Sequence, residues 1–522
     1  MAAATRLVAM FAAACATAPA AQPVAAAAAL PAANLASSAA KVYAPAIDPA
    51  AVKPYVDLLN AMGDDIVHNV IPNAQSWAWI EKNLPLFESP DKEFDQTYYY
   101  RAWILRMHVV STPNGYGISE FIRTQHSGGS ADGHLVMEGR WIHDPVYLDD
   151  AVRNWVSTGP RAFVRYSQWA SDAAWERYLV DYDRGYLIPL LPAMIDEYKR
   201  WEERRYLADV GLFWQYDVQD AMEESISGSR TIPQARPTIN SYMWANAMAI
   251  VHVADMAGDQ ATAREYRQKA RILKYLTQEM LWNPKDEFFE VRTKRGNPAG
   301  VREAIGFIPW YFCMPDPGYE AAWKQLVDPE GFWAPKGITT AERRSPQFRS
   351  HGVGGCEWDG AVWPYTTAQT LTALANVLNR YQQNFVTRED YFKALVTYAL
   401  AHRKRGKPYI GEYHDEKTGE WLKGDNPRSI HYLHSSFIDL VVTGLAGLRP
   451  RADNVLEVNP LVPEDAWDWF CMDNILYHGH LIEVLWDRTG QKYGRGKGLH
   501  VYADGHEIAH SDKIERVTAK LD

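Results

Sequence analysis

Apolar residues recur at steps of three and four along most of the chain, and this spacing is typical of amphipathic helices. The segment after the turn at Gly258 is an example, because Tyr266, Ala270 and Leu273 fall on one face of a helix that begins after Asp259. The same pattern predicts helices at residues 50–62, 94–109, 145–157, 160–170, 186–204, 241–257, 260–280, 321–327, 366–379, 389–403 and 431–447.

The connections between these helices are long and rich in Trp, Tyr, Gly, Asp and His. Loops of this length are uncommon in a compact domain unless they serve a function. So many helices joined by such loops favour a mainly α fold, an (α/α)6 toroid in which outer helices surround a closed inner ring. An α-solenoid is the competing architecture, but a solenoid repeats at a fixed period and the sequence shows none.

The pattern changes near Pro450. From there on, apolar and polar residues alternate, with breaks at Asp-Gly, Thr-Gly and Pro, which indicates strands and hairpins. We expect residues 42–449 to form the toroid and residues 450–522 to form a small antiparallel β-sandwich. A segment this short makes a thin core by itself, so the sandwich is expected to pack against the toroid.

Residues 1–41 are almost entirely alanine, with some Pro and Ser. Arg6, the apolar run after it and several Ala-x-Ala steps predict a signal peptide and a flexible leader, and hence a secreted or periplasmic protein. The run is shorter than the about 20 residues that span a bilayer, and no other segment resembles a membrane span. Cys15 follows a poor lipoprotein-type site, so a lipid anchor is the less favoured alternative.

Composition narrows the range of partners. The formal net charge is −10 and both signs are mixed along the chain, without the basic stripe that nucleic-acid binding requires. The Cys and His residues lack the spacing of zinc ligands, so we expect no metal and no other cofactor. Beyond the signal peptide the cysteines are Cys313, Cys356 and Cys471, which permits one disulfide without requiring it. The oligomeric state is left open.

Residues 216–244 concentrate acidic side chains. Asp220, Glu223 and Glu224 would share one face if this segment were helical. Close carboxylates raise one another's pKa, which can keep one of them protonated near neutrality. Arg236 follows as a candidate substrate ligand, and the alternative for the whole stretch is an exposed acidic turn.

Two further stretches suggest a sugar site. Residues 352–371 place Trp358, Asp359 and Trp363 in a glycine-rich turn, where flat rings suit the apolar face of a sugar and a carboxylate suits its hydroxyls. The alternative is that both tryptophans are core residues. In the other stretch, Glu412 follows a glycine in a loop before a helix and is expected to face a cavity, the alternative being a surface hairpin.

Together these stretches resemble the six-hairpin glycosidases, the clan of trehalases, processing α-glucosidase I and mannosylglycerate hydrolases. "WDGAVWP" at residues 358–364 is similar to the clan's Trp-x-Gly-Pro-x-Trp-Pro loop, with Ala361 in place of proline. "EYHDEKTG" at residues 412–419 is similar to its Glu-x-Tyr-x-Pro-x-Thr-Gly segment, with His414 and Glu416 as departures.

The resemblance implies roles for particular residues. "AMEESISGSR" aligns Glu223 with the clan's general acid, an Asp, although the Ser-Pro-Arg continuation is missing, so Asp220 is the reserve acid. Glu412 matches the general base. "FDQTYYYRAW" resembles the start of related bacterial secreted hydrolases and suggests that Arg101 lines the site, and a similar argument covers Trp141 in "EGRWIHDP".

The expected function is therefore a secreted, exo-acting glycoside hydrolase that acts on plant or microbial oligo- or polysaccharides. In an inverting enzyme of this kind the two carboxyl groups lie about 6.5–9.5 Å apart, with a water between them. A polysaccharide lyase using His431, Tyr432 and His434 is one alternative, and a glycan-binding protein without catalysis is another. Loop chemistry, and not the fold, sets the sugar, its anomer and its linkage.

Overall fold

The computed structural model describes residues 45–63, 65, 70–122, 129–157, 166–293, 296–351, 355–423 and 427–522. The predicted signal peptide and leader lie outside these residues, as does most of the predicted helix 160–170. The part of that helix that is described, residues 166–169, is irregular, and the next helix begins at Ala170.

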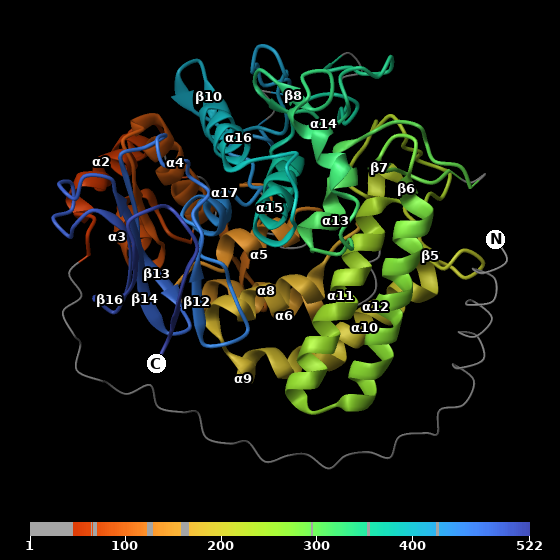
Figure 1. The fold of residues 1–522 in the computed structure, drawn as a ribbon, viewed down its shortest axis with the longest axis horizontal. Coiled ribbons are helices and arrows are strands. Elements are labelled where there is room, and N and C mark those ends of the chain that lie inside the picture. The colour runs from red at the N-terminus through yellow and green to blue at the C-terminus, as the bar shows by residue number, and fades with distance from the viewer. Residues whose placement is uncertain are drawn as a thin grey trace.

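Helices are the predominant secondary structure (Figure 1). The predicted helices at 50–62, 94–109, 145–157, 241–257, 260–280, 366–379 and 389–403 are found with ends shifted by a few residues. The helices are α2 (Pro49–Asn60), α3 (Ser76–Asn83), α4 (Lys92–His108), α5 (Asp132–Gly139), α6 (Val146–Ser157), α8 (Ala170–Asp181), α9 (Arg184–Leu187), α10 (Leu191–Arg205), α11 (Pro237–Ala257), α12 (Gln260–Leu281), α13 (Ile308–Tyr311), α14 (Lys324–Val327), α15 (Pro364–Arg380), α16 (Arg388–Ala401) and α17 (Phe437–Leu440).

The helices form the predicted toroid. Each of α5, α8, α11, α13, α15 and α17 packs against the next, and α17 packs back against α5, so this inner ring is closed. The helices α4, α6, α10, α12 and α16 pack outside it. The pair α11 and α12 shows the sequence logic, because inner α11 is buried nearly all round whereas outer α12 buries one face. Gly258 ends α11 with a φ of 79°, which glycine adopts without strain, and the Asp259 side chain caps α12.

A two-stranded hairpin follows most of the outer helices. The hairpins are β2–β3 (Val109–Thr112, Gly115–Ile118), β4–β5 (Tyr206–Leu207, Leu212–Phe213), β6–β7 (Trp282–Asn283, Phe288–Phe289), β8–β9 (Trp333–Ala334, Gly337–Ile338) and β10–β11 (Arg403–Lys404, Lys407–Pro408). Each hairpin is followed in the chain by an inner helix, and the loops after β3, β5, β9 and β11 meet at one end of the ring, its rim. The strands β6, β7, β8 and β10 lie in the upper part of Figure 1.

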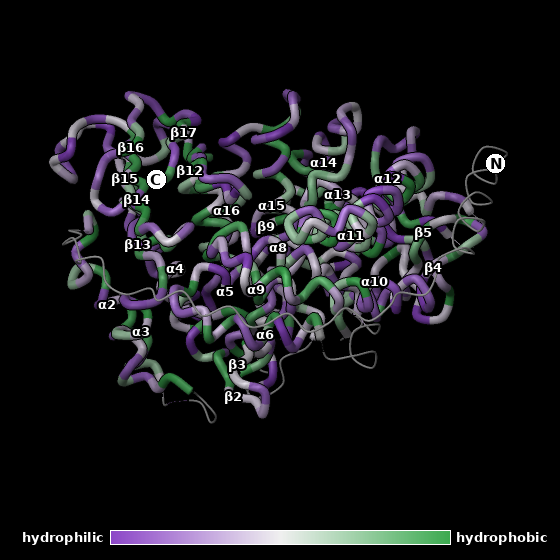
Figure 2. The backbone as a smooth tube through the Cα atoms, turned by 90° about the horizontal axis from the view of Figure 1, so that it is seen from below, coloured by the Kyte–Doolittle hydropathy of each residue, from purple (hydrophilic) through white to green (hydrophobic). Residues whose placement is uncertain are grey.

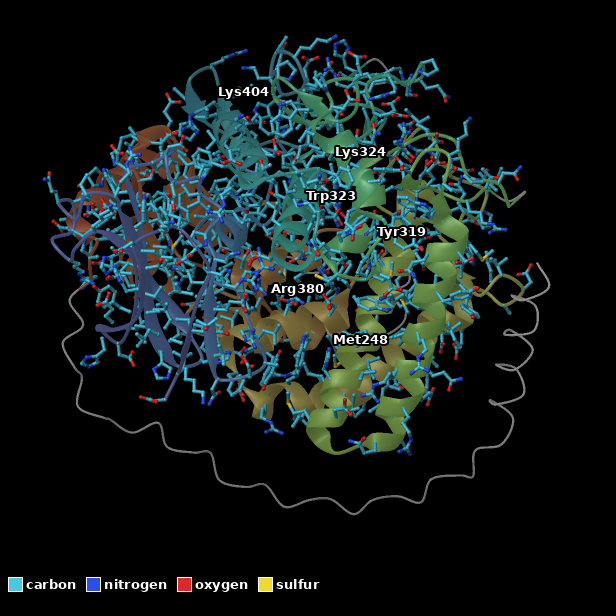
Figure 3. All side chains as sticks on the ribbon, viewed as in Figure 1. Met248, Tyr319, Trp323, Lys324, Arg380 and Lys404 are labelled. Carbon is cyan, nitrogen blue, oxygen red and sulfur yellow. The ribbon has the colours of Figure 1, made fainter. Side chains whose placement is uncertain are left out.

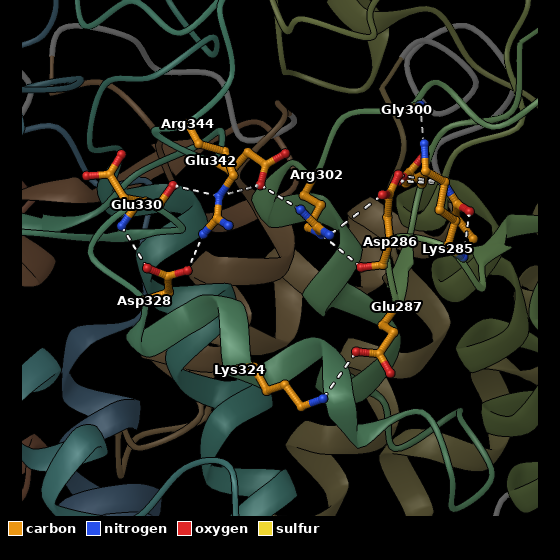
Figure 4. A network of polar contacts seen from close by, with 12 residues as sticks. Lys285, Asp286, Glu287, Gly300, Arg302, Lys324, Asp328, Glu330, Glu342 and Arg344 are labelled. Carbon is orange, nitrogen blue, oxygen red and sulfur yellow. Dashed lines mark hydrogen bonds and ion pairs between the residues drawn. The ribbon is translucent and has the colours of Figure 1, made fainter.

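Ion pairs hold part of this rim together (Figure 4). Arg302 Nη1 lies 2.8 Å from Glu342 Oε2, and Arg344 Nε lies 3.3 Å from the same oxygen. Arg302 also reaches the β6–β7 turn, where its Nε donates to the Asp286 carbonyl at 2.9 Å. Isolated surface pairs stabilise little, but this shared network fixes the stretch that precedes the tryptophan-rich loop.

The C-terminal residues form small antiparallel sheets, as predicted. One sheet has five strands in the order β1-β13-β14-β15-β16, and β12 pairs with β17. Seen from below, the sheet lies beside α2, α3 and α4 at one side of the molecule (Figure 2). The strands are β1 (Leu86–Glu88), β12 (Val455–Val458), β13 (Trp469–Tyr477), β14 (His480–Asp487), β15 (Gly498–Ala503), β16 (His506–Ser511) and β17 (Val517–Lys520).

The edge strand β1 of this sheet comes from the N-terminal part of the chain. Its Leu86 pairs with Asp473 and its Glu88 with Cys471. Ring contacts continue the join, because Phe94 of α4 lies 5.3 Å from Trp467, centroid to centroid. The sheet expected to begin after residue 449 therefore also contains a strand from the N-terminal part of the chain. The division into domains stays a prediction.

One helical prediction is wrong for a local reason, and a second segment does not meet the condition that was set for it. The segment 431–447 is helical only from Phe437, because His431 has a φ of 55° and the Ser435 hydroxyl accepts a hydrogen bond from the buried Arg101. From Val441 to Leu445 the segment is a π-helix. Residues 220–225 are turns and not a helix, because Ala221 and Glu224 have φ of 58° and 62°.

Among the described residues, no helix is both long enough and apolar enough to cross a membrane.

Candidate active site

A cavity of about 420 Å³ opens at the rim of the inner ring. Its lining comes from the loops that follow the hairpins: Glu120 follows β3, Glu223 follows β5, Trp358 follows β9 and Glu412 follows β11. Ring closure, and not proximity in sequence, brings these four segments together. The structure thus places both predicted catalytic glutamates in one cavity, although their carboxyl groups belong to loops far apart in the chain.

Aromatic rings close the lumen beneath this cavity. His134 of α5 lies 4.4 Å from Tyr365 of α15, and Trp169 lies 4.7 Å from Tyr242 of α11 and 5.8 Å from Tyr311 of α13, all between ring centroids. These rings come from different members of the inner ring and fill its centre. A separate cavity of about 130 Å³ lies beyond them, near Arg380 at the other end of α15 (Figure 3).

Glu223 lies in the acidic turn between β5 and α11. Its backbone carbonyl oxygen accepts a hydrogen bond from the backbone N–H of Trp358 at 3.2 Å, which joins the acidic turn to the tryptophan-rich loop. Burial raises the pKa of Glu223 to about 7, and the charge of Glu412 adds to this rise. The side chain can therefore hold a proton near neutral pH, which is what a general acid requires.

Glu412 has a different environment. Its Oε2 lies 2.8 Å from Lys423 Nζ, and the same ammonium group lies 3.2 Å from Cys356 Sγ. Burial disfavours the charged form of Lys423, but the hydrogen bond and ion pair with Glu412 outweigh it and raise the pKa of the lysine. The environments of the two glutamates therefore differ, because an ammonium group lies beside Glu412 whereas burial dominates at Glu223.

Stacked aromatic rings form one wall. The Trp358 and Trp363 rings lie 4.5 Å apart, and Trp363 also stacks on Tyr413 at 4.7 Å. Both tryptophans are buried to within 4% of full burial, yet both line the cavity. The two tryptophans are therefore buried, as core residues would be, and they also form part of the cavity wall. Residues 352–354, the glycine-rich start of this loop, lie outside the described residues.

Asp359 faces a neighbouring cavity of about 570 Å³ and not the one that holds the glutamates. Its Oδ2 accepts a hydrogen bond from Arg349 Nε at 2.6 Å. Trp358 and Asp359 are consecutive residues, but Trp358 lines the cavity with the glutamates and Asp359 lines the neighbouring one. Asp359 is therefore placed beside the predicted site and outside its lining.

The structure places Asp220 and Arg236 in the protein interior. Arg236 Nε donates to Asp220 Oδ2 at 2.7 Å, and both side chains are fully buried. Thr238 also donates to the same carboxylate oxygen. Neither residue lines the cavity, so the reserve acid has no path to substrate in this arrangement.

Arg101 and Trp141 are also interior residues. Arg101 Nη2 lies 3.0 Å from Glu138 Oε1, and both side chains are fully buried. Trp141 Nε1 donates to Asp439 Oδ1 at 2.8 Å. These bonds link α4, α5 and α17, so the two residues connect neighbouring helices of the barrel and do not line the cavity.

Of the residues considered for a lyase, Tyr432 and His434 line the cavity and His431 does not. His431 shares a hydrogen bond of 2.6 Å with the Tyr100 hydroxyl. Burial lowers the pKa of His434 to about 3 and raises that of Tyr432 well above its usual value, so both are neutral at physiological pH.

Sequence reasoning missed Glu120, Lys423 and Arg428, which also line the cavity. Each is a single charged residue in a loop, without a partner at regular spacing in the sequence. For Lys423, the nearby motif around Glu412 was a usable signal, since a base in a buried loop needs charge compensation. No metal-binding group of three or more His, Cys, Asp or Glu side chains occurs within the described ranges.

A closed (α/α)6 ring with paired carboxylates in a cavity at its rim defines the class of six-hairpin glycosidases. Residues 126–435 match the family described as the mannosylglycerate hydrolase MGH1-like glycoside hydrolase domain, and the chain belongs to this family. Residues 448–510 match the C-terminal domain of glycosyl hydrolase family 65, which is the region of the C-terminal sheets.

Known proteins support the fold. A solved structure described as a sialidase is 48% identical with a TM-score of 0.88, and the match covers 91% of this chain and 45% of that one. The GH63 mannosylglycerate hydrolase from Thermus thermophilus, in complex with Tris and D-glycerate, is 13% identical with a TM-score of 0.50, covering 66% of this chain and 99% of that one. That likeness shows the fold alone.

An uncharacterized protein of Borreliella burgdorferi is 25% identical over 197 residues, which are 37% of this chain and 40% of the relative. This chain therefore spans less than half the length of both the sialidase and the Borreliella protein.

Proposed function

We propose that this chain is an exo-acting glycoside hydrolase that inverts the anomeric centre, with Glu223 as general acid and Glu412 as general base. The observation that carries this is the pairing of two unlike carboxyl groups in one cavity. Burial favours the protonated form of Glu223, whereas Lys423 compensates the charge of Glu412. Environments that separate the protonation states of two acids assign the acid and the base.

The reaction needs only these groups and a water. Glu223 gives its proton to the glycosidic oxygen as the bond from that oxygen to the anomeric carbon breaks. The sugar becomes oxocarbenium-like, and a water attacks the opposite face while its proton passes to Glu412. The products are the released alcohol and a free sugar with inverted configuration. Glu412 then releases its proton to solvent and Glu223 takes one up, which restores the starting state.

The closed lumen supports exo action. Among the described residues, rings from different inner helices contact one another beneath the cavity, so we expect a glycan to enter from the rim. A cavity that is closed at its inner end favours the end of a glycan chain over its middle. Trp358, whose ring stacks on Trp363, contributes apolar aromatic surface to the wall, which suits the C–H face of a sugar from a plant or microbial glycan.

A leaving-group comparison tests the two roles. Glu223→Gln cannot donate a proton, so we expect a loss of about 10²–10⁴-fold on a glycoside with a poor leaving group. It should retain more activity on an aryl glycoside with a good leaving group. Glu412→Gln cannot activate water and should fail on both substrates alike. Full activity of Glu412→Gln on either substrate would remove Glu412 as the base.

We further infer export to the periplasm or the medium from the alanine-rich leader at residues 1–41. Expression of the full chain followed by cell fractionation tests this. Protein that stays in the cytoplasm with its leader intact contradicts it.

A further inference from the structure

A third carboxylate, Glu120, lies in the wall of the same cavity as Glu223 and Glu412. It belongs to the loop after β3, and the proposed reaction gives it no proton to move. Its backbone is fixed, because its carbonyl oxygen accepts a hydrogen bond from the Leu433 N–H at 3.2 Å. A buried carboxylate in a substrate cavity costs free energy unless it is hydrogen-bonded, so its partners show what it is arranged to do.

One of its two oxygens is held by the protein. The Tyr432 hydroxyl donates to Glu120 Oε1, and the Ser130 hydroxyl donates to the same oxygen at 3.2 Å. Tyr432 is itself fixed between two rings, since its ring stacks on Phe121 at 4.6 Å and on His434 at 3.8 Å. These contacts orient the carboxylate without using Oε2.

The other oxygen, Oε2, packs against the backbone of Gly129, in the space that a side chain at this position would occupy. A Cβ atom on Gly129 would lie 2.3 Å from Glu120 Oε2, so any larger residue there would displace it. Within the described part of the chain no hydrogen bond reaches Oε2. Gly129 also lines the cavity, which places this acceptor where a bound molecule can donate to it.

The other two acids of the described lining already have an assignment. Glu412 is paired with Lys423, and Glu223 is the proton donor of the proposed reaction. Glu120 is therefore the acid of the described lining that remains for a sugar hydroxyl, which would meet an oriented acceptor there.

We propose that Glu120 is the residue that binds a hydroxyl group of the terminal sugar. This rests on the proposed hydrolase function. Tyr432 and Ser130 are positioning residues that hold Oε1, and Oε2 accepts the hydrogen bond from the substrate. Glu120 therefore contributes to binding and to orientation of the sugar ring, and it transfers no proton.

The test uses the full-length protein and a panel of para-nitrophenyl glycosides of neutral hexoses, pentoses and deoxyhexoses. On the best neutral substrate, Glu120→Gln is expected to lower kcat/KM by roughly 10- to 100-fold, as expected for a hydrogen bond to a charged group, chiefly through KM. Tyr432→Phe keeps the ring stack and should show a smaller loss. Glu420→Gln, an exposed carboxylate in another loop, is the matched control and should match wild type.

Substrate analogues that lack one hydroxyl each make the test decisive. One deoxy analogue should lose the same factor with the wild type that Glu120→Gln loses on the parent sugar, and it should lose nothing more with the variant. If every deoxy analogue loses the same factor in kcat/KM with the wild type as with Glu120→Gln, the assignment of Glu120 is wrong. A fall in kcat of Glu120→Gln without any change in KM also overturns it. A wild type that is inactive on every glycoside of the panel contradicts the proposed function itself.

Discussion

At the residue scale, the protonation state of Glu223 is the feature on which the mechanism depends. Its pKa rises because the protein removes it from water, and the charge of Glu412 adds to this. Sequence reasoning identified both glutamates from motif resemblance. It could not identify Glu120, because the hydrogen bonds of Tyr432 and Ser130 that orient it come from loops separated from it in the sequence. Nor could it show that Asp220 is paired with Arg236 in the interior.

The raised pKa of Glu223 predicts the alkaline side of the pH profile. A general acid must be protonated, so kcat/KM is highest below its pKa and falls as the pH rises through about 7. The measurement is kcat/KM against pH on a substrate with a poor leaving group. In Glu223→Gln no group titrates at that position, and this limb should disappear from the residual activity. An alkaline limb that persists in the variant assigns it to another residue.

The buried pair of Asp220 and Arg236 predicts a loss of stability and not of chemistry. Asp220→Asn leaves a fully buried guanidinium without its counter-charge, which costs about 3–5 kcal/mol of the free energy of unfolding. Urea denaturation measures this. Glu224→Gln is the control, because it breaks a half-exposed pair with Arg230 that contributes less than about 1 kcal/mol.

The ratio of activities on good and poor leaving groups completes the test of Asp220. We expect this ratio to stay at the wild-type value for the folded fraction of Asp220→Asn. A selective loss on poor leaving groups, without a loss of stability, makes Asp220 the acid in place of Glu223.

At the element scale, the long amphipathic helices could be predicted and the short elements could not. The helix pair α11 and α12 follows from periodicity and from the signals at Gly258 and Asp259. The hairpins after the outer helices have strands of only two to four residues, too short for an alternating pattern to stand out. The regular alternation of outer helix, hairpin, loop and inner helix is therefore invisible in the sequence, although it determines where the site lies. The helix expected at 431–447 failed because Arg101 and the left-handed His431 impose an irregular path.

At the scale of the whole molecule, the C-terminal sheet and the toroid share their core. The edge strand β1 and the Phe94–Trp467 contact join the two parts, and the Ala46 N–H donates to Glu483 at 3.0 Å. The sequence predicted that the sheet would need support from the toroid. It could not predict that the N-terminal strand β1 joins the C-terminal sheet, because pairing between distant segments leaves no local pattern.

This joining predicts different results for two truncations. Removal of residues 1–41 takes away no described contact, so we expect an unchanged melting temperature and unchanged activity. Removal of residues 450–522 exposes β1 and the apolar surface around Phe87 and Phe94, so we expect aggregation. Thermal melting and size-exclusion chromatography of both variants measure this. A soluble, cooperatively melting protein without residues 450–522 contradicts the shared core.

The configuration of the first-formed product tests the central claim most directly. A general acid and a general base acting from opposite sides of the sugar give hydrolysis by a single displacement, and the released sugar has the opposite anomeric configuration from the substrate. Proton NMR, recorded as hydrolysis begins and before the product mutarotates, reads this configuration from the anomeric signal. The account predicts that the inverted anomer appears first. If the retained anomer appears first, the reaction passes through a covalent intermediate, and the roles assigned to Glu223 and Glu412 are wrong.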